Sequence, residues 1–281
     1  MQARALKRLM QLTQPQRLDR LAEGLGLIAE HVEKLRGDVV YLGEAGRTRG
    51  LAVLSAQSEE EAAKALILLD LVRMDRRDNE AVGRQIGRFY NHLARCIYAS
   101  MAHMRPAEFR EVRELVETMR PSLYLDGPND VDWIFRNQLL ADREDSVYVD
   151  FVHDDEGDRW STPAAYDEVR FAYLTDVQDL VVSLHRLGCT SRGGLDVIAE
   201  AWTAQKITDE THWQEVAAVN RGIVAELTAK DLASADVTPQ DMVRVIEHWT
   251  FPLSGLDLSE KKVTRAELEA KRARHVDHYW T

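Results

Sequence analysis

Apolar residues recur at helical spacing along most of this chain, and no other sequence feature restricts the fold as strongly. Between residues 17 and 36 they stand at positions 18, 21, 25, 28, 32 and 35, which places them on one face of an α-helix. The same spacing predicts helices over about 44–75, 80–103 and 106–119, with short links between them. Amphipathic helices with short connections form bundles, so residues 1–120 are predicted to be a helical bundle.

Residues 121–163 have a different pattern. Gly127-Pro128-Asn129-Asp130 is a turn signal, and "SVYVDFVHDDEGDRWSTP" at 146–163 alternates before a turn that contains Gly157, which is typical of a β-hairpin. Helical spacing then returns over about 164–187, 194–204, 210–231, 238–249 and 260–279. The expected fold is therefore mainly α, with one β-hairpin insertion at about 146–162 and C-terminal helices, 164–281, packed on the bundle.

Composition limits the classes of function. The formal net charge of −11 argues against a surface that binds nucleic acid all round, although nine basic residues accompany only five acidic ones between Arg73 and Arg113. No run of 18 apolar residues could span a bilayer, and the first residues do not resemble an export signal. The two cysteines, Cys96 and Cys189, form neither a disulfide framework nor a zinc site. We expect a cytoplasmic protein without membrane contact, metal or cofactor.

One predicted helix carries a cationic, titratable face opposite an apolar one. It contains "GRFYNHLARCIYASMAH" at residues 87–103. At 100° per residue, one narrow stripe holds Arg84, Arg88, His92 and Arg95, and His103 follows three turns later. The opposite side holds Ile86, Phe89, Leu93 and Ile97. The helix thus has one face to bury and another to present to a ligand or partner.

Arg88 and His92 are the strongest chemical candidates in that stripe. An arginine one turn from a histidine can hold a phosphate through its planar donors while the imidazole transfers a proton near neutral pH. This pair suits cleavage of RNA by its own 2′-hydroxyl group, which needs no metal. The alternative is a structural histidine at a helix interface, with arginines that simply reach solvent.

A second candidate region, "SEEEAAKALILLD" at residues 58–70, lies on the preceding helix. Glu60 and Lys64 form an i,i+4 pair in the favourable order, and Ala62 and Ala63 allow another helix to approach. A solvated helix face is the structural alternative. The chain has no Glu-x-x-His motif, which a di-metal bundle requires, so metal catalysis is not expected.

Three stretches in order resemble the AbiV-type abortive-infection proteins, a branch of the wider HEPN group of helical domains. They are "GRTRGLAVLSAQSEEEAAKALILLD" (46–70), "RFYNHLARCIY" (88–98) and "REDSVYVDFV" (143–152). The resemblance implies a helical bundle, often dimeric, that acts in bacterial defence against phage. Catalytic HEPN members place an arginine and a histidine at a metal-independent ribonuclease site, but with four to six residues between them. Here only three residues separate Arg88 from His92.

Two hypotheses about function follow. In the first, the protein is a toxin-like effector that cuts RNA or blocks translation as a homodimer, with Arg88, His92, Asn91 and Glu60 in the catalytic site. In this hypothesis Arg84, Arg95, Lys64 and His103 bind the RNA, and the homodimer uses the helices around 46–103. In the second, it is a non-catalytic sensor or adaptor that binds a protein or nucleotide partner. A phage or host protein is a candidate trigger in either case.

Overall fold

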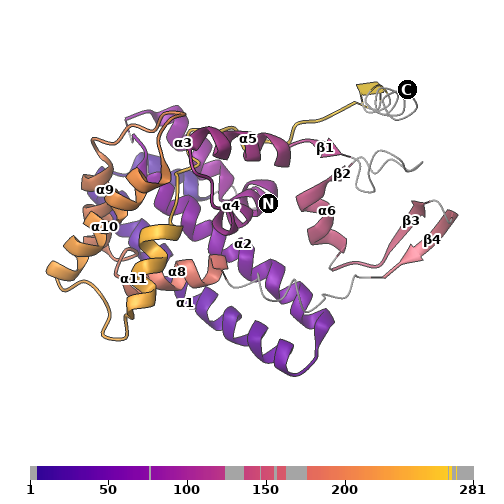
Figure 1. Cartoon of the computed structure of the whole chain (residues 1–281), viewed down its shortest axis with the longest axis horizontal. Coiled ribbons are helices and arrows are strands. Elements are labelled where there is room, and N and C mark those ends of the chain that lie inside the picture. Colours follow the sequence, from indigo (N-terminus) through magenta and orange to yellow (C-terminus); the bar gives the residue numbers. More distant parts are fainter. Residues whose placement is uncertain are drawn as a thin grey trace.

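The computed structural model describes residues 5–75, 77–123, 136–145, 147–154, 157–162, 176–264, 266–267 and 270, and these are mainly helical. The first half forms η1 (Ala5–Gln11), α1 (Gln14–Glu44), α2 (Thr48–Arg73), α3 (Asn79–Arg88), α4 (His92–His103) and α5 (Phe109–Met119). The middle forms β1 (Ser122–Leu123), β2 (Arg136–Asn137), α6 (Gln138–Asp145), β3 (Asp150–Asp154) and β4 (Gly157–Ser161). The rest forms α8 (Asp176–Arg186), α9 (Arg192–Trp202), α10 (Trp213–Ala229) and α11 (Pro239–His248), as Figure 1 shows.

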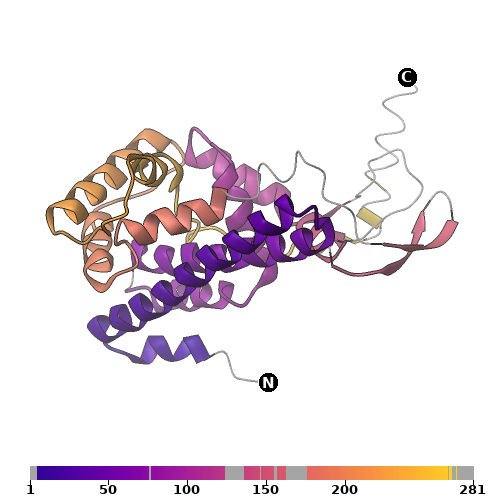
Figure 2. The same ribbon diagram turned by 90° about the horizontal axis from the view of Figure 1, so that it is seen from below.

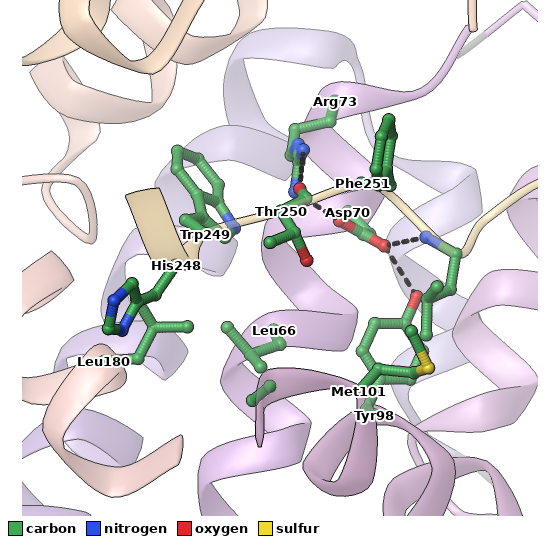
Figure 3. A pocket seen from close by; sticks show the side chains of 12 residues that line it. Leu66, Asp70, Arg73, Tyr98, Met101, Leu180, His248, Trp249, Thr250 and Phe251 are labelled. Carbon is green, nitrogen blue, oxygen red and sulfur yellow. Dashed lines mark hydrogen bonds and ion pairs between the residues drawn. The ribbon is translucent and has the colours of Figure 1, made fainter. Parts of the chain in front are cut away.

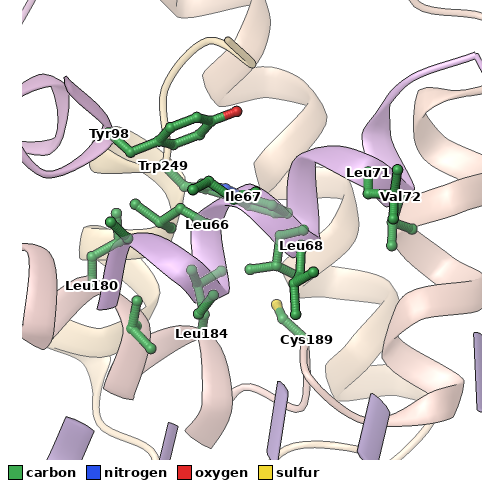
Figure 4. Packing of buried hydrophobic residues seen from close by; sticks show 14 of the residues in the cluster. Leu66, Ile67, Leu68, Leu71, Val72, Tyr98, Leu180, Leu184, Cys189 and Trp249 are labelled. Atoms are coloured by element: carbon green, nitrogen blue, oxygen red, sulfur yellow. The ribbon is translucent and has the colours of Figure 1, made fainter. Parts of the chain in front are cut away.

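The second half of α2 is the centre of the body. Between Ala62 and Arg73 every side chain except Lys64 is buried, because α1, α3, α4, α8 and α9 all contact this helix. Figure 4 shows Leu66 and Leu68 of α2 among side chains of the C-terminal helices. One apolar cluster joins the N-terminal helices to α8–α11, so the C-terminal helices cover the bundle.

Local sequence signals define the ends of α1, the longest of the described helices. Thr13 precedes it and forms a capping box with Gln16, and Pro15 stands in its first turn, where proline needs no hydrogen-bond donor. Gly46, at φ +65°, lies in the turn to α2. Figure 2 shows α1 running alongside the other helices of the body.

The prediction of one helix over 80–103 is wrong at its middle. α3 ends at Arg88 and α4 begins at His92, because the Asn91 side chain accepts a hydrogen bond from the Ala94 backbone N–H at 3.0 Å. An asparagine that caps a new helix competes with continuation of the old one. The break separates residues that one continuous helix would place in a single stripe.

The predicted β-hairpin is confirmed. β3 and β4 pair antiparallel, with Phe151 opposite Trp160, and Figures 1 and 2 show the hairpin projecting from one end of the helical body. The short β1–β2 pair and α6 were not predicted. The turn predicted at 127–130 and most of the helix predicted at 260–279 lie outside the described residues.

Candidate functional site

The half-exposed imidazole of His92 contacts a buried carboxylate. Its Nδ1 lies 2.8 Å from Oε2 of Glu60, and the two side chains are 49% and 7% exposed. An ionised carboxylate only accepts hydrogen bonds, so Nδ1 carries a proton and donates it to Glu60. In the neutral ring the lone pair then lies on Nε2, for which the described residues provide no partner. His92 therefore presents a base in an orientation that Glu60 fixes.

Two arginines complete the surroundings of the carboxylate. Nη1 of Arg95 lies 2.8 Å from Oε2 of Glu60, and Nε of Arg143 donates to Oε1. Burial acts to raise the pKa of Glu60, but the hydrogen bond from Arg143, together with the contact with His92 and the charge of Arg143, outweighs burial and holds that pKa below its ordinary value. Glu60 is consequently ionised at neutral pH. We call Glu60, His92, Arg95 and Arg143 the Glu60 cluster.

Three helices supply the Glu60 cluster. α2 carries the carboxylate, the first turn of α4 carries His92 and Arg95, and α6 carries Arg143. Residues three apart on a helix share a face, so the two side chains from α4 both reach α2. Nε of Arg95 also donates to the Phe89 carbonyl at 2.9 Å, while Asn91 caps the same turn. These bonds fix the start of α4 and with it the position of His92.

Arg88 lies outside the Glu60 cluster. It is buried, and its guanidinium donates to Oε1 of Gln85 at 2.6 Å, to the Leu253 carbonyl at 2.9 Å and to the Leu256 carbonyl. It lies at the end of α3, before the helix break at 89–91, and no hydrogen bond among the described residues joins it to His92. Arg88 therefore holds the C-terminal segment in place instead of facing the imidazole.

The remaining predicted residues are distributed over several surfaces. Asn91 caps α4, Arg84 is exposed and pairs with Glu80, and His103 faces Asp176 at 3.4 Å. Lys64 pairs with Glu61 and lies 5.5 Å from the centre of the Phe89 ring. Arg95 thus belongs to the Glu60 cluster and Lys64 lies near it, whereas Arg84 and His103 contact other parts of the chain.

Sequence reasoning missed Arg143, and it also missed a buried polar network. Arg143 stands in the third stretch that carries the resemblance, but no local spacing connects it to α2. Asp70 and Arg73, spaced i,i+3 in an apolar stretch, did give a signal: charges inside such a stretch need buried partners. Their Oδ1–Nη1 distance is 3.1 Å, and both side chains are at most 3% exposed.

Asp70 and Arg73, with the groups that they bond, form the Asp70 network. It attaches the segment around Thr250 and Leu253 to the bundle, and Figure 3 shows its bonds. Oδ2 of Asp70 accepts from the Tyr98 hydroxyl at 2.8 Å and from the Leu253 backbone N–H at 2.7 Å. Nη2 of Arg73 donates to the Thr250 carbonyl at 2.6 Å. Burial raises the pKa of Asp70 and of Tyr98, and it lowers that of Arg73. The adjoining cavity of about 30 Å³ has room for little more than water, so the network is structural.

The comparisons with known proteins add no family. No family model, no curated protein and no solved structure matches the chain. Among the described residues, no helix has the length and hydropathy to cross a membrane. The same residues contain no group of three His, Cys, Asp or Glu side chains arranged to hold a metal ion.

Proposed function

We propose that the protein is a cytoplasmic abortive-infection effector similar to the AbiV and HEPN proteins, and that it cleaves RNA without a metal. The observation that carries the proposal is the contact between His92 and Glu60. A half-exposed imidazole whose Nδ1 is held by an ionised carboxylate is the arrangement that makes Nε2 an oriented general base. The resemblance of the three stretches supports the same chemistry.

In the proposed reaction Nε2 of His92 takes the proton of a 2′-hydroxyl group. The 2′-oxygen attacks the adjacent phosphorus, the bond from phosphorus to the 5′-oxygen breaks, and the protonated imidazole returns its proton to that oxygen. The products are a 2′,3′-cyclic phosphate and a 5′-hydroxyl end. Glu60 stabilises the imidazolium, and the guanidinium groups of Arg95 and Arg143, which both pair with Glu60, are the proposed stabilisers of the pentavalent phosphate. Arg88 has no role in this version of the site.

The proposed assembly is a homodimer that uses the helices around 46–103. Exposed apolar side chains on these helices and on α1 support it, since Tyr41 is 70% exposed and Val53 is 42% exposed. HEPN-type sites lie at dimer interfaces, so a second copy beside α4 would enclose the exposed side of His92. A phage or host protein is the proposed trigger.

A non-catalytic sensor or adaptor is the second candidate function, and the hairpin favours it. Phe151 and Trp160 form an edge-to-face pair with ring centres 5.2 Å apart, and their exposed fractions are 55% and 70%. Tyr148 and Val149 beside them are also exposed. Exposed aromatic side chains on a projecting element are typical of a surface that binds another protein.

The test is incubation of the purified protein with cellular RNA, with and without a chelator, for the wild type, His92→Gln and Glu60→Gln. We expect cleavage that the chelator does not affect, product ends with 2′,3′-cyclic phosphate, and at least a 100-fold loss of rate in His92→Gln. The matched control is His31→Gln, which changes an exposed histidine on α1 and should leave the rate unchanged. Cleavage by His92→Gln at the wild-type rate would refute the catalytic proposal and leave the adaptor.

A further inference from the structure

A second hollow lies away from the Glu60 cluster and has walls from three parts of the chain. Its volume is about 290 Å³, and it is lined by Arg105, Pro106, Trp213, Glu247, His248 and Thr250. The linker after α4 provides the first two residues, α10 begins at Trp213, and the end of α11 and the following turn provide the others. This volume is near the lower end of small-molecule sites and suits one compact ligand.

The walls are held together without a ligand. The Trp213 backbone N–H donates to the Ala107 carbonyl at 2.8 Å, and the Phe109 N–H donates to the Thr211 carbonyl at 3.1 Å. On the opposite wall, Thr250 is tied to the Asp70 network through Arg73. A hollow with fixed walls loses little conformational entropy when a ligand binds.

Arg105 brings a positive charge to this hollow and forms no ion pair among the described residues, although Glu247 also lines the hollow. Its Nη1 donates to the Ala102 and Met104 carbonyls at 2.8 and 3.0 Å, and its Nη2 lies 2.9 Å from Nδ1 of His248. All three acceptors are neutral, and in the described part of the chain no Asp or Glu comes within ion-pair distance of it. A guanidinium group is always charged, so its position favours an anion.

His248 is neutral and supplies a second donor. Burial lowers the pKa of His248 most, and the charge of Arg105 lowers it further. Asp176 and Glu247 act to raise this pKa and Arg244 acts to lower it, but each of the three contributes less. Since a guanidinium cannot accept, Nδ1 of His248 accepts from Arg105 and the ring proton lies on Nε2. Arginine together with an N–H of histidine suits the several acceptor oxygens of a phosphate.

The other walls suit the rest of a nucleotide. Trp213, which is half-buried, offers a flat apolar surface on which a base can stack, and the buried Pro106 lies in the wall of the same hollow. The carboxylate of Glu247 accepts hydrogen bonds from vicinal hydroxyl groups, as acidic residues do with ribose in dinucleotide sites, and Thr250 adds a hydroxyl group. We infer that this hollow binds a nucleoside monophosphate, with its phosphate on Arg105 and His248, its base on Trp213 and its ribose on Glu247.

The experiment is titration calorimetry on the full chain, with AMP, adenosine, inorganic phosphate and free tryptophan as separate probes. We expect AMP to bind at least tenfold more tightly than adenosine or phosphate alone. We also expect 0.5 M NaCl to weaken the binding of AMP but not that of adenosine. Free tryptophan tests the competing ligand class, an amino acid whose carboxylate and ammonium would meet Arg105 and Glu247. Binding of tryptophan without AMP would overturn the proposal.

Variants locate the binding. Arg105→Gln should weaken the binding of AMP at least tenfold and leave the binding of adenosine unchanged. Trp213→Leu should weaken the binding of both ligands. Arg110→Gln is the matched control, because this exposed arginine on α5 pairs with Glu108 and does not line the hollow. Thermal melting identifies any variant that fails to fold, and Glu247→Gln, at an exposed position, then provides a second test.

Two further outcomes separate this site from the ribonuclease proposal. AMP should bind to His92→Gln as it does to the wild type, because that residue lies in the Glu60 cluster and not in the hollow. Loss of AMP binding in His92→Gln, or unchanged binding in both Arg105→Gln and Glu247→Gln, would overturn the assignment. Absence of RNA cleavage would not affect it.

Discussion

Replacing Arg88 by methionine should destabilise the protein by about 3–5 kcal/mol. The change removes three hydrogen bonds and leaves Oε1 of Gln85 and the carbonyls of Leu253 and Leu256 without their donor. Gln85 and Leu253 are 0% and 3% exposed, so water cannot replace the donor there. Each buried acceptor that loses a charged donor costs about 1–3 kcal/mol, while the methionine retains most of the apolar contact of the arginine stem.

The assay is thermal and urea unfolding followed by circular dichroism. For a chain of this size, the expected loss lowers the melting temperature by about 5–15 °C. Arg84→Met is the matched control: one helical turn earlier, its side chain is 56% exposed and pairs with Glu80, so its effect should stay below about 0.5 kcal/mol.

The result also separates two hypotheses about Arg88. If the arginine were a phosphate clamp, as the sequence suggested, Arg88→Met would unfold at the wild-type temperature and lose activity only. An unchanged melting temperature would therefore refute the structural role of Arg88. A lowered one, together with easier proteolysis between residues 249 and 258, supports it.

Three other changes test separate parts of the structure. Tyr98→Phe removes the hydroxyl donor to Asp70 and should cost about 1–3 kcal/mol in urea unfolding. Gly194→Ala should destabilise the protein strongly in the same assay, because the added Cβ would lie 2.0 Å from a backbone carbonyl oxygen. The added Cβ of Gly193→Ala, in contrast, would meet only a flexible side chain, at 3.1 Å. Because the pKa of Glu60 is lowered on folding, its stabilising contribution is present above pH about 4.5 and disappears as the pH falls through the folded value. The difference in melting temperature between the wild type and Glu60→Gln should accordingly shrink as the pH falls below about 4.5.

The helices and the hairpin were predictable because their signals are local. The apolar spacing of α1 and the alternation at 147–152, which leads into β3, are both patterns of neighbouring residues, and the periods of a helix and a strand differ clearly over such lengths. The break at Asn91 was harder to predict, because asparagine in a helical pattern marks a cap only when its side chain bonds to the backbone ahead. The apolar periodicity continues through the break and conceals it.

The partners of the candidate residues were not predictable, because they come from distant parts of the chain. Glu60 and His92 were both selected from sequence, yet nothing in the spacing indicated that they touch, and Arg143 lies 83 positions from Glu60. Arg88 and Leu253 are 165 positions apart. Sequence periodicity identifies which face of a helix is polar, but only the packing of helices decides whether that face meets solvent or a buried carbonyl.

The break at 89–91 is what allows one polar stripe to serve two purposes. A continuous helix would direct Arg88, His92 and Arg95 to the same side, and all three would compete for Glu60 or for solvent. With the break, Arg88 fixes the end of α3 to the Leu253 and Leu256 carbonyls, and the next turn is free to face Glu60. Arg95 then bonds back to the Phe89 carbonyl, so the corner that Arg88 anchors also orients the turn that carries His92. The position of the imidazole thus depends on residues 253–256, although no described hydrogen bond joins them to it.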